Sequence, residues 1–290
     1  MQLPIPMLPG RRAEVRLNET REALRDKVVA ITGGARGIGF QTATDLLAAG
    51  ARVAIGDIDA DAVGKAAADL GVEGIELDVT DSSSFAAFLD AVEERVGPVD
   101  VLINNAGIMP VGAFLDYDER LIRRTIEIDL VGVILGSQEA ARRMVARGRG
   151  QIVNVASVAG RLPTPGLTVY NGAKAGVIEF SEALDAELSG KGVRISTVLP
   201  TFTNTGLITV LATNGMVTSV EPEEVTKQIL ATIVRPRVRI AAPRAMGWVN
   251  AQALMPQPLK AYLRRVAKTD TIFLQPDPAA RADYSARIGQ

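Results

Sequence analysis

The stretch that decides the fold is Thr32-Gly33-Gly34-Ala35-Arg36-Gly37-Ile38-Gly39. It follows a Val- and Ile-rich run at residues 28–32 and opens into an Ala- and Leu-rich run at residues 40–49. A strand, a glycine-rich turn and a helix in this order present backbone N–H groups and the positive end of a helix to a pyrophosphate. We therefore predict a dinucleotide site, in which Gly33 makes the tight turn, Gly37 admits the pyrophosphate and Gly39 allows close packing.

The same alternation continues along the chain. Short apolar runs occupy residues 28–32, 52–56, 74–77, 99–103, 151–156, 193–199 and 237–241, and helical stretches begin near Ile38, Ala60, Ser82, Glu119, Val169 and Pro222. Apolar strands separated by helices indicate a parallel sheet covered on both faces. The predicted fold class is α/β, a single doubly wound, Rossmann-type domain with a mostly parallel seven-stranded sheet and helices on both faces.

This domain is expected at residues 27–245, between an N-terminal leader at 1–26 and a C-terminal appendage at 246–290. Within the appendage, residues 270–290 are expected to be irregular. Residues 248–267 mix apolar and basic side chains, which suit a membrane surface, a cover for the pocket or a subunit interface.

The composition narrows the chemistry. The 290 residues include no histidine and no cysteine, which excludes Ser-His-Asp and Cys-His catalysis, thiol redox chemistry and the usual zinc and iron–sulfur sites. We therefore expect no metal, and a general acid or base must be Asp, Glu, Lys or Tyr. The net charge of −1 gives no electrostatic case for nucleic acid as a partner. No apolar run reaches the ~20 residues that span a bilayer, so we expect a cytoplasmic protein.

Two acidic residues at predicted strand ends bear on the cofactor. A carboxylate at Asp57 would accept hydrogen bonds from both ribose hydroxyls and repel a 2′-phosphate, which favours NAD(H) over NADP(H). The alternative is a helix-capping or turn residue. Arg36 argues weakly for a 2′-phosphate, unless it is simply solvated. Asp78 either accepts from the adenine amino group or caps residues 80–84.

Tyr170 and Lys174 carry the predicted chemistry. Their i, i+4 spacing at the start of a helical stretch places them on one face. An ammonium beside a phenol stabilises the phenolate, so we expect a lowered tyrosine pKa and proton exchange coupled to hydride transfer at a carbonyl carbon. Ser157, at the end of the strand predicted at residues 151–156, would hydrogen-bond the substrate oxygen, unless it is only a turn residue.

Four motifs in this order resemble the short-chain dehydrogenase/reductase family across residues 27–245: Thr32 to Gly39, Asn104-Asn105-Ala106-Gly107, Ser157, and Tyr170-Asn-Gly-Ala-Lys174. The resemblance implies that Tyr170 is the catalytic acid/base, that Lys174 binds the nicotinamide ribose and lowers the tyrosine pKa, and that Ser157 polarises the substrate oxygen. Pro200 and Thr205 resemble the stretch that receives the carboxamide. The implied cofactor contacts are Gly33, Arg36, Gly37, Ile38, Gly39, Asp57, Asp78, Val79, Asn105, Ala106, Gly107, Tyr170, Lys174, Pro200 and Thr205.

The chain departs from this family at Ile128-Asp129-Leu130-Val131-Gly132, where Asp129 stands in place of the family's asparagine, and at Pro200-Thr201, where the family has Pro-Gly. In the family the asparagine position holds a helix irregularity and a water of the proton relay. The resemblance therefore places Asp129 with the catalytic residues, where its carboxylate would stabilise the Lys174 ammonium.

The prediction is an oxidoreductase that transfers a hydride between NAD(H) and a secondary alcohol or ketone, or a primary alcohol or aldehyde. Residues 201–220 are apolar and almost uncharged, which favours an apolar substrate unless these residues only pack as a lid. Residues 199–208 resemble the family branch that acts on steroids, retinoids and lipid alcohols, which implies a bulky lipophilic substrate. The alternative is a non-enzymatic dinucleotide sensor or scaffold, with a lyase or epimerase as a third reading. The resemblance also implies a homodimer or homotetramer built through residues 119–147 and 169–188.

Overall fold

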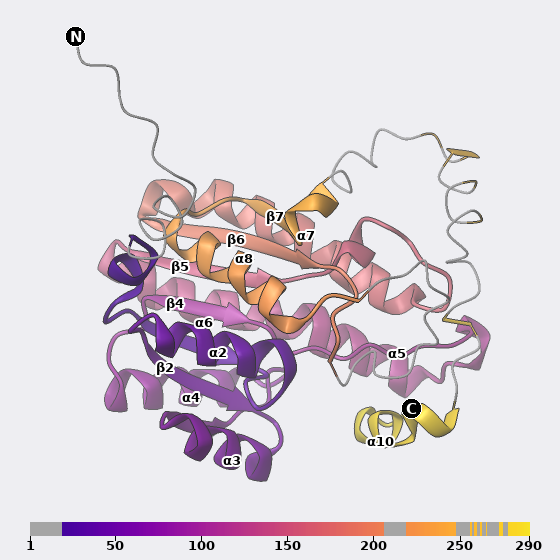
Figure 1. The fold of residues 1–290 in the computed structure, drawn as a ribbon, viewed down its shortest axis with the longest axis horizontal. Coiled ribbons are helices and arrows are strands. Elements are labelled where there is room, and N and C mark those ends of the chain that lie inside the picture. Colours follow the sequence, from indigo (N-terminus) through magenta and orange to yellow (C-terminus); the bar gives the residue numbers. More distant parts are fainter. Residues whose placement is uncertain are drawn as a thin grey trace, which may run out of the picture.

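The computed structural model describes residues 19–205, 219–247 and 278–290, together with residues 256, 258, 259, 262, 265, 273 and 274. Seven strands form one sheet in the order β3-β2-β1-β4-β5-β6-β7 (Figure 1). Every pairing between neighbouring strands is parallel. The strands are β1 (Val28–Thr32), β2 (Arg52–Asp57), β3 (Glu73–Glu76), β4 (Val101–Asn104), β5 (Gly150–Val155), β6 (Val193–Pro200) and β7 (Arg239–Ala242).

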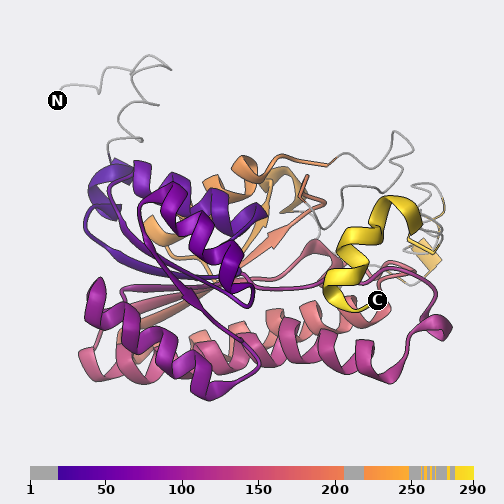
Figure 2. The same cartoon turned by 90° about the horizontal axis from the view of Figure 1, so that it is seen from below.

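Helices cover both faces of this sheet. The α-helices among the described residues include α2 (Gly37–Ala48), α3 (Ala60–Leu70), α4 (Ser82–Arg95), α5 (Glu119–Ile126), α6 (Gly132–Arg147), α7 (Thr168–Leu188), α8 (Pro222–Val234) and α10 (Pro278–Ile288). One apolar core lies between the sheet and α2, α3 and α8, and a second lies between the sheet and α4, α6 and α7. Figure 2 shows the sheet between these two layers. The predicted doubly wound fold is confirmed, and the sheet is parallel throughout.

The strand order reverses between β1 and β4, so the connections that follow these two strands diverge to opposite faces of the sheet. Such a point leaves a crevice at the carboxyl ends of the strands. Aspartates shape the turns beside it, because Asp59 caps α3, Asp81 caps α4 and Asp118 caps α5 through their carboxylates. The topology therefore assigns the ligand site to the edge where the glycine-rich turn stands.

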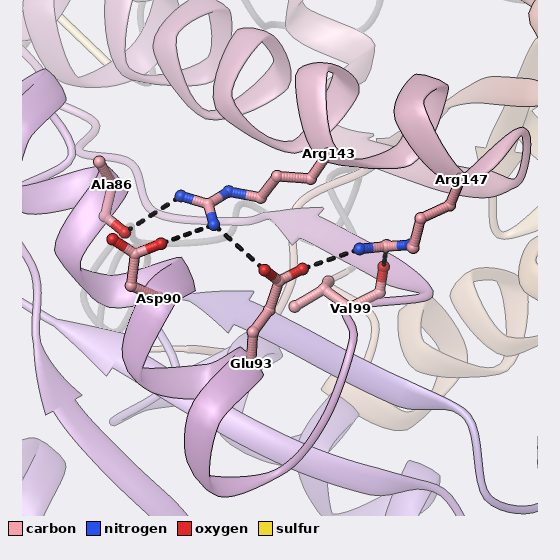
Figure 3. Close-up of polar contacts among 6 residues, drawn as sticks. All are labelled: Ala86, Asp90, Glu93, Val99, Arg143 and Arg147. Carbon is pink, nitrogen blue, oxygen red and sulfur yellow. Dashed lines mark hydrogen bonds and ion pairs between the residues drawn. The ribbon is translucent and has the colours of Figure 1, made fainter.

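Side-chain ion pairs fix α6 against α4 on one face of the sheet (Figure 3). Arg143 lies 2.6 Å from Asp90 and 3.2 Å from Glu93, and Arg147 lies 2.8 Å from the other oxygen of Glu93. The Arg147 guanidinium also donates to the Val99 carbonyl. Single exposed pairs add roughly 0–1 kcal/mol, but here one carboxylate is shared by two arginines. This network therefore orients α6 in addition to the apolar packing beneath it.

The structure corrects the expectation that residues 270–290 are irregular, because Pro278–Ile288 form α10. Alanines and arginines favour this helix locally, and its docking on the domain stabilises it, a tertiary effect that sequence periodicity does not reveal. The helix irregularity that the resemblance implies at Asp129 is present, because a turn of π-helix, η2 (Glu127–Val131), separates α5 from α6.

In the part of the chain that the structure describes, no helix has the length and apolar character needed to cross a bilayer. The described residues also contain no group of three or more acidic side chains arranged to hold a metal ion.

Candidate active site

A cavity of about 1090 Å³ lies at the carboxyl edge of the sheet. It is lined by every residue predicted for the site except Gly39, which lies beneath the turn. The catalytic candidates and the glycine-rich turn therefore share one space, although they come from segments more than a hundred residues apart. A cavity of this size is large enough for a dinucleotide together with a small substrate.

The glycine-rich turn is packed too closely for other residues at two positions. A Cβ on Gly39 would lie 2.2 Å from the Gly33 carbonyl oxygen. Gly33 has φ +64°, and a Cβ there would lie 2.8 Å from the Ala106 Cα. The Thr32 hydroxyl accepts the N–H groups of Asn105 and Ala106, both at 3.0 Å. The segment after β4 therefore braces the turn from below.

The turn leaves the beginning of α2 open. Arg36 is the residue before the helix and makes no side-chain cap, and the first turn of the helix contains no acidic residue. A helix start without a cap has N–H groups that point at the space beyond it, together with the positive end of the helix dipole. Thr205 faces this start, since its Cγ2 would lie 3.3 Å from a Cβ on Gly37. These groups fit the pyrophosphate of a dinucleotide.

Asp57 lies at the end of β2 beside the turn and lines the cavity. Its carboxylate accepts the N–H groups of Ala35 and Asp59, each at 3.3 Å. Both oxygens therefore have partners, yet the contacts are long and the carboxylate still faces the cavity. Arg36 forms an ion pair of 2.6 Å with Asp59, so this arginine is paired and not simply solvated.

Asp78 follows β3, and its carboxylate accepts both the N–H and the hydroxyl of Thr80, at 2.9 and 2.7 Å. These contacts are those of a local cap, which is one of the two roles predicted for Asp78. Asp78 and Val79 both line the cavity, so the residue also borders the space for the adenine end of a dinucleotide.

Tyr170 is 8% exposed, in the first turn of α7, and Ser157 lies at the end of β5 beside it. Burial raises the pKa of the Tyr170 phenol, and the negative charge of Asp129 raises it further, while a hydrogen bond with Ser157 lowers it. The Ser157 hydroxyl accepts the Ala159 N–H at 3.1 Å. The net direction of the Tyr170 pKa is upward, the opposite of the lowering expected from Lys174.

Lys174 is directed to Asp129. Its Nζ lies 3.1 Å from Asp129 Oδ1, donates to the Val155 carbonyl at 3.3 Å, and is 5.7 Å from the centre of the Tyr170 ring. The two charged side chains are 4% and 0% exposed. Burial raises the Asp129 pKa from 3.8 to about 6, and the neighbouring Lys174 charge opposes this rise. The lysine charge that would favour a phenolate is thus largely compensated.

Two local features create the room for this ion pair. The π-helical turn η2 carries Asp129 and directs its side chain inward. Gly107 leaves space on the other side, because a Cβ there would lie 2.5 Å from Asp129 Oδ1 and 3.3 Å from Lys174 Nζ. The Ile108 N–H donates to Asp129 Oδ1 at 3.2 Å, whereas Oδ2 is buried without a partner among the described residues. That oxygen is available to accept a hydrogen bond from a water or ligand.

Sequence reasoning missed an amide network beneath the site. Asn104 Nδ2 donates to Asn154 Oδ1 at 2.9 Å and to Ser137 Oγ at 3.2 Å, and Asn154 Nδ2 donates to Ser181 Oγ at 2.9 Å. These buried bonds join β4 and β5 to α6 and α7. A run of buried strand residues interrupted by an asparagine is the one signal that marks Asn154.

Tyr284 of α10 was also missed, and it lines the same cavity. Its hydroxyl accepts the Met109 N–H at 2.7 Å. Burial raises the Tyr284 pKa, and the charge of Asp129 is among the further contributions, which places α10 within electrostatic range of the ion pair. Nothing in the local sequence links residue 284 to a site whose predicted members all precede residue 206, because only the folded chain brings them together.

Ser157, Tyr170 and Lys174 line one cavity with the glycine-rich turn, as the resemblance to the family predicts. The family model described as short chain dehydrogenase matches residues 27–215, and the chain belongs to this family. It is accordingly an oxidoreductase that acts on CH–OH groups with a nicotinamide dinucleotide.

The chain is similar to several characterised relatives. It is 37% identical over 220 residues to cis-4-hydroxycyclohexanecarboxylate dehydrogenase from Sinomonas cyclohexanicum, covering 74% of this chain and 86% of that protein. It is 36% identical over 180 residues to galactitol 2-dehydrogenase from Agrobacterium fabrum, covering 61% and 70%. The structure resembles 3-ketoacyl-(acyl-carrier-protein) reductase from Brucella melitensis complexed with NADH, with a TM-score of 0.68, 26% identity, and 77% and 99% of the two chains covered.

Proposed function

We propose that the chain is an NAD(H)-dependent dehydrogenase of secondary alcohols and ketones, in which Tyr170 moves the proton. The observation that carries the proposal is the shared cavity, in which Ser157, Tyr170 and Lys174 face the same space as the open start of α2. The bound nicotinamide supplies or accepts the hydride. Tyr170 donates a proton to the substrate oxygen or takes one from it, and Ser157 holds that oxygen by a hydrogen bond.

NAD(H) is proposed over NADP(H) because of the charges around the ribose end. The Asp57 carboxylate faces the cavity and would repel a 2′-phosphate. Arg36, which would attract one, is engaged by Asp59. The similar reductase from Brucella melitensis is described in complex with NADH, which supports the same choice.

The side chains around Tyr170 support an apolar carbon skeleton for the substrate. Met109, Ala159, Leu167 and Phe202 line the cavity near the phenol and pack in one apolar cluster with it. Most of residues 201–220, on which the lipophilic hypothesis rested, lies outside the described residues. Because the similar proteins are named for a hydroxycyclohexanecarboxylate and a sugar alcohol, we propose a ring-sized secondary alcohol and keep bulkier lipid alcohols within the test.

A substrate panel with purified protein tests this function. Cyclohexanol, cis-4-hydroxycyclohexanecarboxylate, galactitol and a sterol are offered with NAD or NADP, and nicotinamide absorbance is followed. The Tyr170→Phe variant should lose roughly 10²–10⁴-fold in turnover, the range for general acid–base help. Tyr262→Phe removes a hydroxyl from a tyrosine that is 64% exposed and should leave turnover unchanged.

Each outcome of the panel has a distinct meaning. Equal turnover by wild type and Tyr170→Phe would overturn the role of the phenol. Binding of NADH without turnover of any alcohol or ketone in the panel would favour the non-enzymatic sensor or scaffold.

A further inference from the structure

The helix α10 is held against the cavity wall by bonds to one residue of the segment after β4. Met109 donates its N–H to the Tyr284 hydroxyl at 2.7 Å, and its carbonyl accepts from the Arg281 guanidinium at 3.0 Å. The Gln290 side chain donates to the Val111 carbonyl just beyond. Both backbone groups of Met109 are thus bonded to side chains of α10, which fixes the position of the helix at the cavity.

The last turn of α10 rests on α5. A Cβ on Gly289 would lie 2.8 Å from Arg120 Nη2 and 3.3 Å from Arg124 Nη1, so both guanidinium groups stand at the carboxyl end of the helix. Cations are favourable there because the helix dipole is negative at that end. With the bonds to Met109, this contact fixes α10 in the middle and at its end.

One face of α10 then borders the cavity through Tyr284, Arg287 and Ile288. The guanidinium carbons of Arg281 and Arg287 lie 4.8 and 5.1 Å from the centre of the Tyr284 ring. Such stacking restricts an arginine without neutralising it. Arg287 is therefore oriented by the ring while its charge stays exposed to the cavity.

Arg287 lines the same cavity as Asp57, which ends β2, and Asp59, which follows it. The Asp59 pKa is held below its usual value of 3.8 first by the hydrogen bond from Arg36, and the positive charge of Arg287 is the smallest of the contributions. Asp59 itself is already bound to Arg36 at 2.6 Å. Among the described residues Arg287 forms no ion pair, and its guanidinium lies over the Tyr284 ring.

From this arrangement we propose that Arg287 binds a phosphate of the adenosine half of the dinucleotide, in the cavity that it shares with the open start of α2. The inference rests on the proposed cofactor site. The glycine-rich turn supplies neutral N–H donors, and the charge of Arg36 is paired with Asp59. Arg287 therefore adds an unpaired positive charge that can form charge-assisted hydrogen bonds with the phosphate. The phosphate is one of the diphosphate, which NADH carries, and competition with a 2′-phosphate compound separates this source from the other.

The test measures binding, so it does not depend on the substrate. NADH is titrated by its fluorescence into wild type, Arg287→Gln, Arg287→Lys and Arg149→Ala at low and high salt. Arg149 is an exposed arginine that precedes β5, at the opposite edge of the sheet. Arg287→Gln should raise the NADH Kd about ten-fold at low salt and flatten its salt dependence. Arg287→Lys should restore most of the affinity, and Arg149→Ala should match wild type.

Competition by adenosine, ADP and adenosine 2′,5′-bisphosphate locates the contact. Arg287→Gln should leave the binding of adenosine unaffected and weaken the binding of ADP. A loss confined to the bisphosphate would assign Arg287 to a 2′-phosphate and overturn the inference. An unchanged NADH Kd in Arg287→Gln, with wild type binding normally, overturns the inference alone. Failure of wild type to bind either NADH or ADP overturns the proposed function and the inference with it. If Arg287→Gln weakens the binding of adenosine and of ADP equally, Arg287 has a structural role, and the inference is also overturned.

Discussion

Asp129 Oδ1 lies 3.1 Å from Lys174 Nζ in a pair that is almost fully buried. The carboxylate compensates the lysine charge and at the same time raises the Tyr170 pKa. The chain therefore holds Tyr170 as a neutral phenol more firmly than a lysine-tyrosine pair alone would. A phenol that keeps its proton suits donation to a ketone, whereas alcohol oxidation requires a phenolate.

The first prediction concerns the pH dependence of oxidation. In Asp129→Asn the negative charge beside Tyr170 is removed and Lys174 is no longer compensated, so the phenolate becomes easier to form. The rise of kcat for alcohol oxidation with pH should shift to lower pH by about one unit. Steady-state kinetics across pH 6–10 measure this shift. An Asp129→Asn profile that coincides with wild type would falsify the electrostatic role of the carboxylate.

A second prediction follows from the Asp129 pKa, which is about 6 in the folded chain against 3.8 as the ordinary value. Between these values the folded state binds more protons than the unfolded state, so Asp129 lowers the free energy of unfolding as pH rises from about 4 to 6. Urea unfolding of wild type and Asp129→Asn at pH 4, 5, 6 and 7 measures this contribution. The stability of wild type relative to the variant should fall across that interval and then level off. A constant difference between the two proteins would contradict the raised pKa.

The third prediction concerns the glycine-rich turn. Gly39→Ala would place a Cβ 2.2 Å from the Gly33 carbonyl oxygen, so the helix and the turn must separate. We expect a loss of about 1–3 kcal/mol in the free energy of unfolding and weaker NADH binding. Gly64→Ala is the matched control, because a Cβ in that position of α3 meets nothing within 4 Å. It should stabilise the chain by about 0.5–1 kcal/mol. Similar unfolding curves for the two variants would show that the close approach at Gly39 is unimportant.

The fourth prediction concerns cofactor choice. Asp57→Ala removes the carboxylate that faces the ribose end of the cavity, so the ratio of NADPH to NADH affinity should rise by about ten-fold or more. Asp61→Ala is the control, because it makes the same change of charge at an exposed position of α3. Fluorescence titrations with both cofactors measure the ratio. Tighter binding of NADPH than NADH by wild type would be incompatible with the proposed role of Asp57.

The sheet and its helices follow from local patterns, and their bounds in the structure differ from the predicted ones by two residues or fewer at β2, β3 and β4. The spacing of the glycines also predicted the turn, because the close contact that requires a glycine at residue 39 is with the nearby Gly33 carbonyl oxygen. The raised pKa of Tyr170 could not be predicted from such local patterns. Its pKa depends on how deeply the phenol is buried and on a carboxylate that a π-helical turn directs inward, and neither is encoded in i, i+4 spacing.

The α10 helix shows a second limit. Its alanines and arginines favour a helix, but its position depends on bonds to Met109, which lies far away in the sequence. Contacts between distant segments are set by the completed fold. Tyr284 and Arg287 therefore join the site only in three dimensions, whereas Tyr170 and Lys174 are neighbours on one helix.

The π-helical turn at Glu127–Val131 holds one residue more than a regular helix would, and each residue turns an α-helix by about 100°. Removing one residue there would re-phase α6 relative to α5, so the side that packs on the sheet and the direction of Asp129 would change in the same event. The electrostatics of the site and the packing of α6 are thus tied to a single insertion. Substitutions can change the electrostatics of the site and the packing of α6 separately, but an insertion or deletion in this turn changes both.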